Sequence, residues 1–202
     1  MTAPTGPGSE PPRRAQRAVV ACLLPFLLAF GAATAATAAP REAIDPALER
    51  SVKAAFLYKF LGFVEWPAAA LDESAGPITI GVIGADAIAA ELEQIVPGRT
   101  LGGKPIAVRR LRAADSLADI HLLFVGRASE RLLAQFTQKA QRHSVLTVCE
   151  SANPYARGCA INFVIAEGRV RFEVSQQTAE NSGLRLSSRL LAVARNVEIG
   201  RP

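Results

Sequence analysis

The sequence has few of the residues that build metal centres, redox centres or disulfide frameworks. Its 202 residues include three cysteines and two histidines, and no C-x-x-C pair is present. Neither His121 nor His143 is spaced with a cysteine as in a zinc site, so we expect no metal. Glycine and proline follow no collagen-like repeat, and charged residues make up only 20% while apolar residues make up 50%. A collagen-like or wholly disordered chain is thereby excluded.

Motifs that bind nucleotide cofactors or activate a nucleophile are also missing. The best phosphate-loop candidate, Gly81 to Asp86, has neither the G-x-G-x-x-G spacing nor a Gly-Lys-Ser/Thr triplet. No G-x-S-x-G elbow is present, and the carboxylates form no cluster in the sequence. We therefore expect no cofactor, no catalytic residues and no enzyme activity. An active site assembled from distant residues is the alternative that these absences leave open.

The first 38 residues have the organisation of a secretory signal peptide. A basic cluster from Arg13 to Arg17 precedes an apolar run from Ala18 to about Gly31, and two A-x-A cleavage sequences follow. We expect cleavage after Ala38; an uncleaved membrane anchor is the alternative. Because no second apolar span follows, we expect residues 39–202 to form a single domain in the periplasm of a Gram-negative cell.

The net charge of +5 says little about partners. Residues 1–38 hold three arginines against one glutamate, so the rest of the chain has 20 basic and 17 acidic residues, a net charge of +3. This is an ordinary surface balance, and an exported protein does not meet the chromosome. We expect no nucleic-acid partner.

Export changes the interpretation of the two remaining cysteines. Cys149 and Cys159 lie ten residues apart, and the periplasm is oxidising, so we expect a disulfide between them. It would close a loop of turn-forming residues that also contains Tyr155 and Arg157. A partner could bind this aromatic ring and this cation, which makes the segment a candidate partner-binding loop. The alternative is that the bridge serves stability alone.

Alternating helix and strand patterns predict an α/β fold. Several strands are apolar throughout, which is typical of parallel strands covered on both faces. Two late strands flank Glu167-Gly168 and predict a tight hairpin. The expected fold is a three-layer α/β/α sandwich, mostly a parallel sheet with an antiparallel C-terminal hairpin. The predicted helices cover residues 45–65, 86–96, 129–142, 176–181 and 187–196, and the predicted strands cover residues 78–84, 105–111, 121–125, 145–148, 161–166 and 169–175.

Three polar residues are expected to cap helices. Asp45 stands before Pro46, a favoured first helical residue, and Asp86 and Ser129 stand at the predicted starts of two later helices.

The first predicted helix is rich in aromatic residues. We expect Phe56, Phe60 and Phe63 to face the sheet. Leu57 and Tyr58 lie on other sides of this helix and are the better candidates for an interface in a homodimer.

Ligands of α/β folds bind beyond the carboxyl ends of the strands. Those ends are predicted near Gly84, Gly126-Arg127 and Glu150. A periplasmic sensor or binding protein for a small molecule is therefore one functional hypothesis.

Short segments along the rest of the chain form an ordered pattern. They include VKAAFLYKF and FVEWP, and the full set is Val52–Phe60, Phe63–Pro67, Leu101–Ile106, Ile120–Val125, Val145–Val148, Ile161–Phe163, Val170–Val174 and Gly183–Leu191. In this order the segments resemble the YfiR-like family of periplasmic regulatory proteins. Lys59 stands where such sequences often carry asparagine, and Gln176-Gln177-Thr178 where they often carry Asn-Leu-Ala. These departures leave partner specificity open.

The resemblance implies regulation without catalysis. The family's characterised type represses a membrane-bound diguanylate cyclase by acting on its periplasmic sensor domain, which controls cyclic di-GMP and biofilm formation. An OmpA-like outer-membrane lipoprotein can sequester such a repressor, and the family type forms homodimers. Similar domains also occur beside histidine kinases, so a small-molecule sensor partnered with a histidine kinase or another receptor is the alternative.

Overall fold

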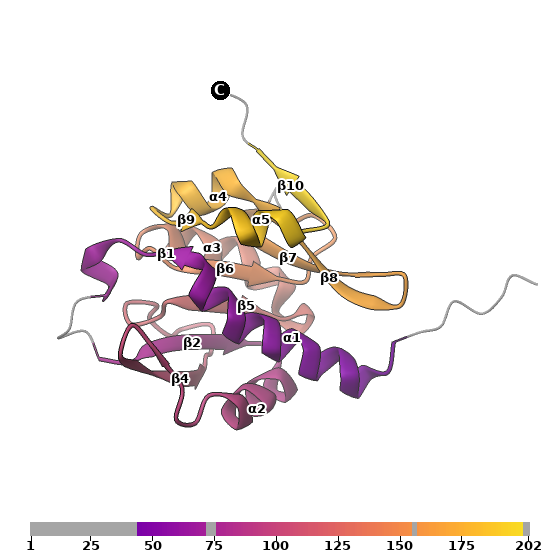
Figure 1. Cartoon of the computed structure of the whole chain (residues 1–202), viewed down its shortest axis with the longest axis horizontal. Coiled ribbons are helices and arrows are strands. Elements are labelled where there is room, and N and C mark those ends of the chain that lie inside the picture. Colours follow the sequence, from indigo (N-terminus) through magenta and orange to yellow (C-terminus); the bar gives the residue numbers. More distant parts are fainter. Residues whose placement is uncertain (1–43, 72–75, 155–156, 200–202) are drawn as a thin grey trace, which may run out of the picture. The chain divides into compact units, whose positions relative to one another are not determined.

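The computed structural model describes residues 44–71, 76–154 and 157–199, and the predicted signal peptide lies outside this part of the chain. The described residues form helices and strands in alternation (Figure 1). The α-helices are α1 (Pro46–Phe60), α2 (Asp86–Ile95), α3 (Leu133–Gln141), α4 (Gln176–Asn181) and α5 (Ser188–Val193), and the 3-10 helices are η1 (Leu61–Phe63), η2 (Ala68–Leu71) and η4 (Arg127–Leu132). The strands are β1 (Val64–Glu65), β2 (Ile78–Ile83), β3 (Thr100–Leu101), β4 (Lys104–Arg110), β5 (Leu122–Val125), β6 (Leu146–Cys149), β7 (Ile161–Ala166), β8 (Arg169–Ser175), β9 (Arg185–Leu186) and β10 (Asn196–Glu198).

The main sheet of the described residues has the strand order β10-β8-β7-β6-β5-β2-β4-β3. Neighbouring strands from β4 through β2, β5 and β6 to β7 are parallel. Strand β8 runs antiparallel to β7, and β3 runs antiparallel to β4. The predicted α/β class, mainly parallel sheet and antiparallel hairpin are therefore confirmed.

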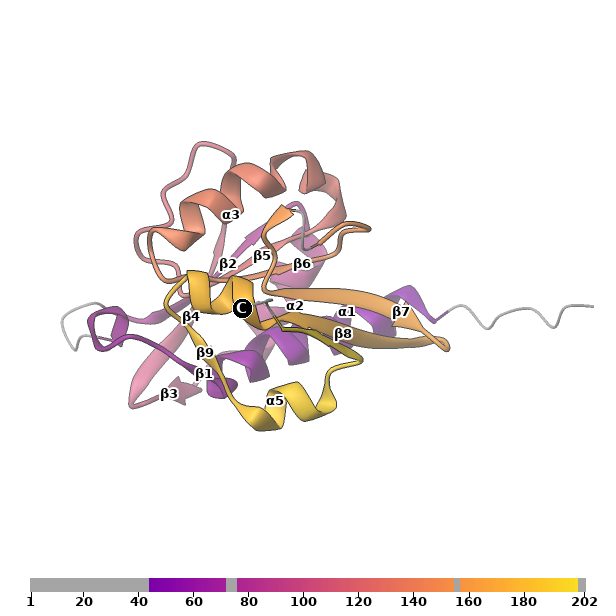
Figure 2. The ribbon, with the colours of Figure 1, turned by 90° about the horizontal axis from the view of Figure 1, so that it is seen from above.

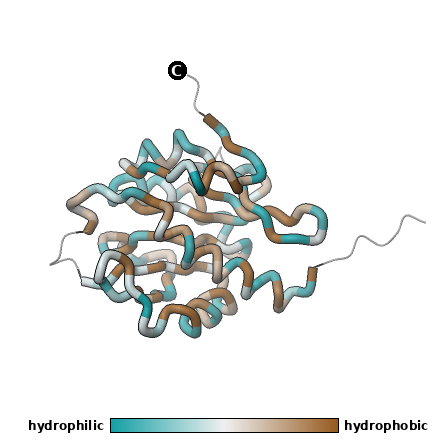
Figure 3. The backbone as a smooth tube through the Cα atoms, in the orientation of Figure 1, coloured by the Kyte–Doolittle hydropathy of each residue, from teal (hydrophilic) through white to brown (hydrophobic). Residues whose placement is uncertain are grey.

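Two hydrophobic cores lie on opposite faces of this sheet. In β5, Leu122 and Phe124 join the core under α1 and α2, whereas Leu123 and Val125 join the core under α3. This alternation follows from the two-residue period of a strand. Figure 2 shows α3 on one side of the sheet and α1 on the other, and Figure 3 shows that hydrophobic residues gather in the sheet strands.

Helix α1 begins where the sequence predicts but ends at Phe60, because the chain expected to stay helical up to residue 65 tightens into η1 and then extends as β1. Asp45 Oδ1 accepts a hydrogen bond from the N–H of Ala47 at 2.8 Å, with Pro46 as the first helical residue. The ring centroid of Phe60 lies 5.9 Å from that of Phe163 and 5.1 Å from that of Phe172. These aromatic pairs fix α1 against the β7–β8 hairpin.

The prediction that Leu57 could form a dimer interface is wrong. Its side chain is fully buried in the core below α1. Tyr58 is half-buried, and the Arg99 guanidinium lies 4.9 Å from its ring centroid. The helix is therefore apolar over a wider arc than its four-residue repeat indicated.

Two predicted helix caps are corrected. Ala85 is the N-cap of α2, and Asp86 lies in the first helical turn without a capping bond. Ser129 lies inside η4 with non-helical φ and ψ angles, and α3 begins only at Leu133. The close packing of Ser129 on Gly84 accounts for its position, since a side-chain atom added to Gly84 would lie 2.5 Å from Ser129 Oγ.

The C-terminal segment also differs from its prediction. The helix expected to reach residue 196 ends at Val193, and Asn196–Glu198 forms β10 beside β8. The hairpin is consequently covered on its outer edge by a further strand. The short pair β1–β9 was not predicted either, because two-residue strands carry no periodic signal.

His121 immediately precedes β5, and both of its ring nitrogens form hydrogen bonds. Nδ1 accepts from the N–H of Thr79 at 3.2 Å, so Nε2 carries the proton and donates to the carbonyl of Ala70 at 2.9 Å. Desolvation by burial lowers the pKa of His121 below its usual 6.5, although its hydrogen bond to Ala70 opposes this shift. The histidine is thus a neutral structural residue that holds η2 against the sheet.

This geometry predicts a pH-dependent stability. Well above pH 6.5, His121 is neutral in both the folded and the unfolded state. As the pH falls through 6.5, His121 is protonated more readily in the unfolded state, because its pKa is lower in the folded state. The free energy of unfolding should therefore fall as the pH is lowered below about 6.5, by at most about 1.4 kcal/mol per pH unit. Denaturant titrations followed by the fluorescence of Trp66, the chain's one tryptophan, measure it.

The control is the exposed second histidine. His121→Gln should flatten the pH dependence in this window, whereas His143→Gln should leave it unchanged. An equal slope in the wild type and the His121→Gln variant would contradict the assignment.

Candidate functional site

The carboxyl ends of the parallel strands converge on one edge of the sheet. Gly84 follows β2, Gly126 and Arg127 follow β5, and Glu150 follows β6. The parallel registers place these positions side by side, as the sequence predicts. The chain leaves β2 toward β4 and later returns to β5 on the other side of β2, so the switch in strand order lies between β2 and β5.

The crevice at this switch point is filled by the chain's own backbone. A side-chain atom added to Gly126 would lie 2.5 Å from the Gly84 carbonyl oxygen and 2.7 Å from the Ala85 Cβ. The loops after β2 and β5 therefore pack on each other where other α/β proteins hold a phosphate group. Gly84 has a φ of +68°, a backbone conformation that favours glycine, and this conformation allows the two loops to approach closely.

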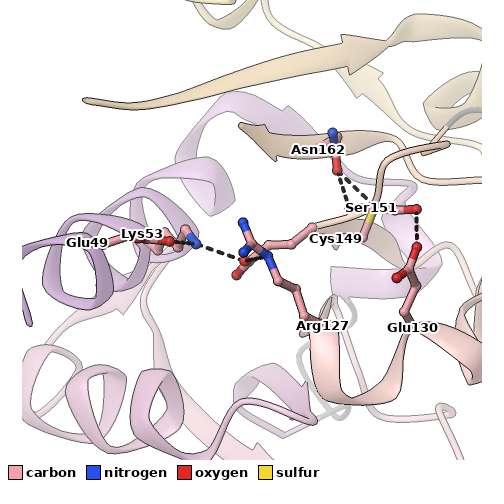
Figure 4. Close-up of polar contacts among 8 residues, drawn as sticks. Glu49, Lys53, Arg127, Glu130, Cys149, Ser151 and Asn162 are labelled. Carbon is pink, nitrogen blue, oxygen red and sulfur yellow. Dashed lines mark hydrogen bonds and ion pairs between the residues drawn. The ribbon is translucent and has the colours of Figure 1, made fainter. Parts of the chain in front are cut away.

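A buried network of charges lies beside this closed crevice, at the end of β6 (Figure 4). Lys53 on α1 is 3% exposed, and its Nζ forms ion pairs with Glu49, one helical turn earlier, and with Glu150 Oε2 at 2.8 Å. Arg127 Nε contacts the same Glu150 oxygen at 3.1 Å. The Glu150 side chain is only 7% exposed, and both of these cations contact its carboxylate. The network ties α1 to the sheet edge.

The disulfide anchors the loop that follows β6. Cys149 and Cys159 are bonded and fully buried. Closing a loop of this length contributes about 2.5–3 kcal/mol to stability by limiting the unfolded chain. Thr147 Oγ1 donates to the carbonyl of Gly158 at 3.2 Å, and Thr137 Oγ1 donates to the carbonyl of Arg157 at 2.6 Å. The loop is therefore held by both β6 and α3.

Asn162 joins this loop to the hairpin. Its Oδ1 accepts the N–H of Ser151 at 2.9 Å and lies 3.4 Å from the sulfur of Cys149. Ser151 Oγ in turn donates to Glu130 Oε1 at 2.8 Å (Figure 4). An open cavity of about 390 Å³ lies here, lined in part by Arg127, Glu130 and the outer residues of β7.

Comparisons with known proteins identify the family. The model of the YfiR/HmsC-like family matches residues 50–195 of this chain. The chain belongs to the YfiR/HmsC-like family. The resemblance carried by the ordered sequence segments is therefore confirmed.

Among solved structures, a conserved domain protein from Vibrio cholerae O1 biovar eltor strain N16961 is similar in fold. The TM-score is 0.50 at 11% sequence identity, and the match covers 74% of this chain and 60% of that one. This chain therefore spans three fifths of the Vibrio protein's length, and the likeness concerns the fold alone. No curated protein matches the sequence significantly.

The structure separates the residues that Ser-His chemistry would need to bring together. His121 lies at the amino end of β5 and His143 precedes the amino end of β6, whereas the Ser151–Glu130 pair lies at the carboxyl edge. Neither of the chain's two histidines can thus act as a base for Ser151. Among the described residues, no group of three or more His, Cys, Asp and Glu side chains could hold a metal ion.

The predicted partner-binding loop is only partly described. Tyr155 lies outside the described residues. Arg157 is half-buried, and its Nη1 donates to the Glu130 carbonyl at 3.3 Å, so the cation is turned toward η4. A role of either residue in partner binding stays a prediction.

Sequence reasoning missed Lys53, Glu130 and Asn162. Lys53 stands four residues after Glu49, and this Glu-to-Lys spacing on a helix is a recognisable signal for an ion pair. Its burial depends on Glu150, which is remote in the sequence. Asn162, a polar residue within an apolar strand, was a second overlooked signal.

The glycine contact at the switch point predicts the effect of one added methyl group. Gly126 has φ −74°, so an alanine there suffers no backbone strain and the cost comes only from the clash with Gly84. Gly126→Ala should lower the free energy of unfolding by about 1–3 kcal/mol, measured by denaturant titration.

Gly62→Ala is the matched control, because nothing lies within 4 Å of an added Cβ at Gly62. It should leave stability unchanged or slightly raised. Equal effects of the two substitutions would show that the loops after β2 and β5 do not pack as described.

Proposed function

We propose that this protein is an exported, non-catalytic regulator that binds the periplasmic sensor domain of a membrane diguanylate cyclase and represses it. Membership of the YfiR/HmsC-like family is the observation that carries the proposal. The family model begins at residue 50, after the predicted signal peptide of residues 1–38, which fits a single exported domain over residues 39–202.

The described surface supports binding by a rigid module. None of the described helices has the length and apolar character needed to span a bilayer. The carboxyl edge of the sheet is fixed by ion pairs, a disulfide and side-chain hydrogen bonds. Such an edge loses little conformational freedom when a partner docks, which lowers the cost of association.

The remaining partners belong to the same proposal. An OmpA-like outer-membrane lipoprotein sequesters the regulator and releases the cyclase, and the regulator acts as a homodimer. A sensor for a small molecule that reports to a histidine kinase is the alternative. The open cavity of about 390 Å³ near Arg127 favours that alternative, because it falls within the range of ligand sites.

Deletion of the gene provides the test. Loss of a repressor should raise cyclic di-GMP and surface attachment, and restoring the gene should return both to their starting values. Extracted cyclic di-GMP is measured by mass spectrometry in strains that express the protein. Unchanged levels after deletion would contradict repression of a cyclase.

A further inference from the structure

One strand edge in the middle of the sheet is left open. Strand β7 pairs with β8 along its whole length, from Ile161 to Ala166. Its ladder with β6 includes only Ile161 and Asn162. Within the described part of the chain, residues 163–166 therefore have no strand partner on the β6 side. Figures 1 and 2 both show the β7–β8 hairpin extending past the neighbouring strands.

The fold prevents β6 from covering this edge. After Cys149, the chain is held by Lys53 and Arg127 at Glu150, and by Asn162 Oδ1 at the N–H of Ser151. The disulfide fixes the same point. The open edge is consequently a property of the folded protein and is formed before any partner arrives.

Backbone geometry shows which groups the edge presents. The two-residue turn Glu167-Gly168 has φ angles of 54° and 66°, as in a type I′ turn. The residues that flank such a turn bond to each other, and bonding alternates along an antiparallel pair. The backbone N–H and C=O groups of Val164 and Ala166 therefore point toward β8. Those of Phe163 and Ile165 point to the open side.

This edge lacks the usual protection against strand addition. Proteins commonly blunt an exposed edge with charges, with proline or with a very short strand. The strands at the two ends of the main sheet are short, with two residues in β3 and three in β10. Strand β7, with the sequence INFVIA, has neither a charged residue nor a proline, and Ile165 is 40% exposed.

A cation stands beside the open edge. Arg127 lines the same cavity as Phe163 and Ile165, and its side chain is 68% exposed although Nε contacts Glu150. Most of the guanidinium thus remains open to a second acceptor. Arginine binds carboxylates through paired N–H groups, which adds geometric specificity.

We propose that the open edge of β7 binds an extended segment of a partner protein, which adds as a strand beside Phe163–Ala166. The segment places an apolar side chain against Ile165 and a carboxylate on Arg127. Main-chain hydrogen bonds give such complexes their affinity, and the flanking side chains select the sequence. The identity of the partner as a cyclase sensor domain rests on the proposed function, whereas the edge itself does not.

A short synthetic peptide of alternating valine and threonine with a central glutamate is the probe. Binding is followed by the amide signals of the isotope-labelled protein in NMR titrations. Shifts and slowed hydrogen exchange should centre on Phe163 and Ile165. Ile165→Lys should weaken binding about tenfold or more by adding an edge charge, and Ile165→Pro should do so by removing an edge N–H.

Val193→Lys is the matched control, because Val193 is an exposed apolar residue, 66% accessible, at the end of α5, and the chain that follows it pairs with β8 on the opposite edge of the hairpin. It should bind like the wild type. Arg127→Gln should weaken binding of the glutamate peptide more than binding of a glutamine version of the same peptide. Absence of binding, shifts elsewhere, or equal losses for Ile165→Lys and Val193→Lys would overturn the proposal. The protein could also form a dimer in which the amides of Phe163 and Ile165 exchange slowly without peptide. If Ile165→Lys dissociated this dimer, the edge would bind a second copy of the chain and not a partner protein.

The cell-based readout separates this proposal from the proposed function. If deletion raises cyclic di-GMP and the Ile165→Lys protein, present at wild-type levels, still restores repression, then the edge plays no part and repression stands. If the peptide binds at β7 but deletion leaves cyclic di-GMP unchanged, then the edge stands and repression of a cyclase fails.

Discussion

The buried ion pair between Lys53 and Glu150 sets the arrangement of the whole carboxyl edge. A lysine with 3% exposure and a carboxylate with 7% exposure are stable only when they meet, because each loses its hydration on burial. Their contact holds α1 over the sheet in the position in which Phe60 packs on Phe163 and Phe172. It also fixes the direction of the chain as it leaves β6.

The remaining features of the edge follow from this direction. Glu150 pairs with Lys53 on α1, the next residue, Ser151, donates its N–H to Asn162 Oδ1, and the disulfide begins at the preceding residue, Cys149. Strand β6 then ends two residues into its pairing with β7, and the outer half of the hairpin stands free. A rigid open strand beside an exposed arginine suits recognition of a protein segment better than chemistry on a small substrate.

Much of the fold could be predicted because local patterns and tertiary packing agree. The central strands are buried on both faces, so an uninterrupted apolar run such as Leu122–Val125 identified its strand directly. Helix α4 and both strands of the hairpin begin and end where their patterns do. The two helix caps failed at positions where long-range packing, such as Ser129 on Gly84, outweighs a capping preference.

The candidate site was less predictable, since its parts come from distant segments. The positions after β2, β5 and β6 could be named from strand order, and the Cys149–Cys159 pairing from export and spacing. Lys53 could not be placed, because a lysine in an amphipathic helix is ordinarily solvated and its buried partner lies almost a hundred residues away. The free edge of β7 depends on where β6 ends, and there the Lys53–Glu150 pair and the hydrogen bond from Ser151 to Asn162 hold the chain together.

A double-mutant cycle on Lys53 and Glu150 tests this account most directly. Lys53→Met, Glu150→Gln and the double variant are compared with the wild type by denaturant unfolding. The cycle on the exposed Arg110–Glu93 pair, which has a 2.9 Å contact, provides the reference. We expect a coupling of about 1–3 kcal/mol between Lys53 and Glu150 and a clearly smaller coupling for the exposed pair, where water screens the two charges. Additive effects of Lys53→Met and Glu150→Gln, within about 0.5 kcal/mol, would show that the pair does not hold α1 to the end of β6.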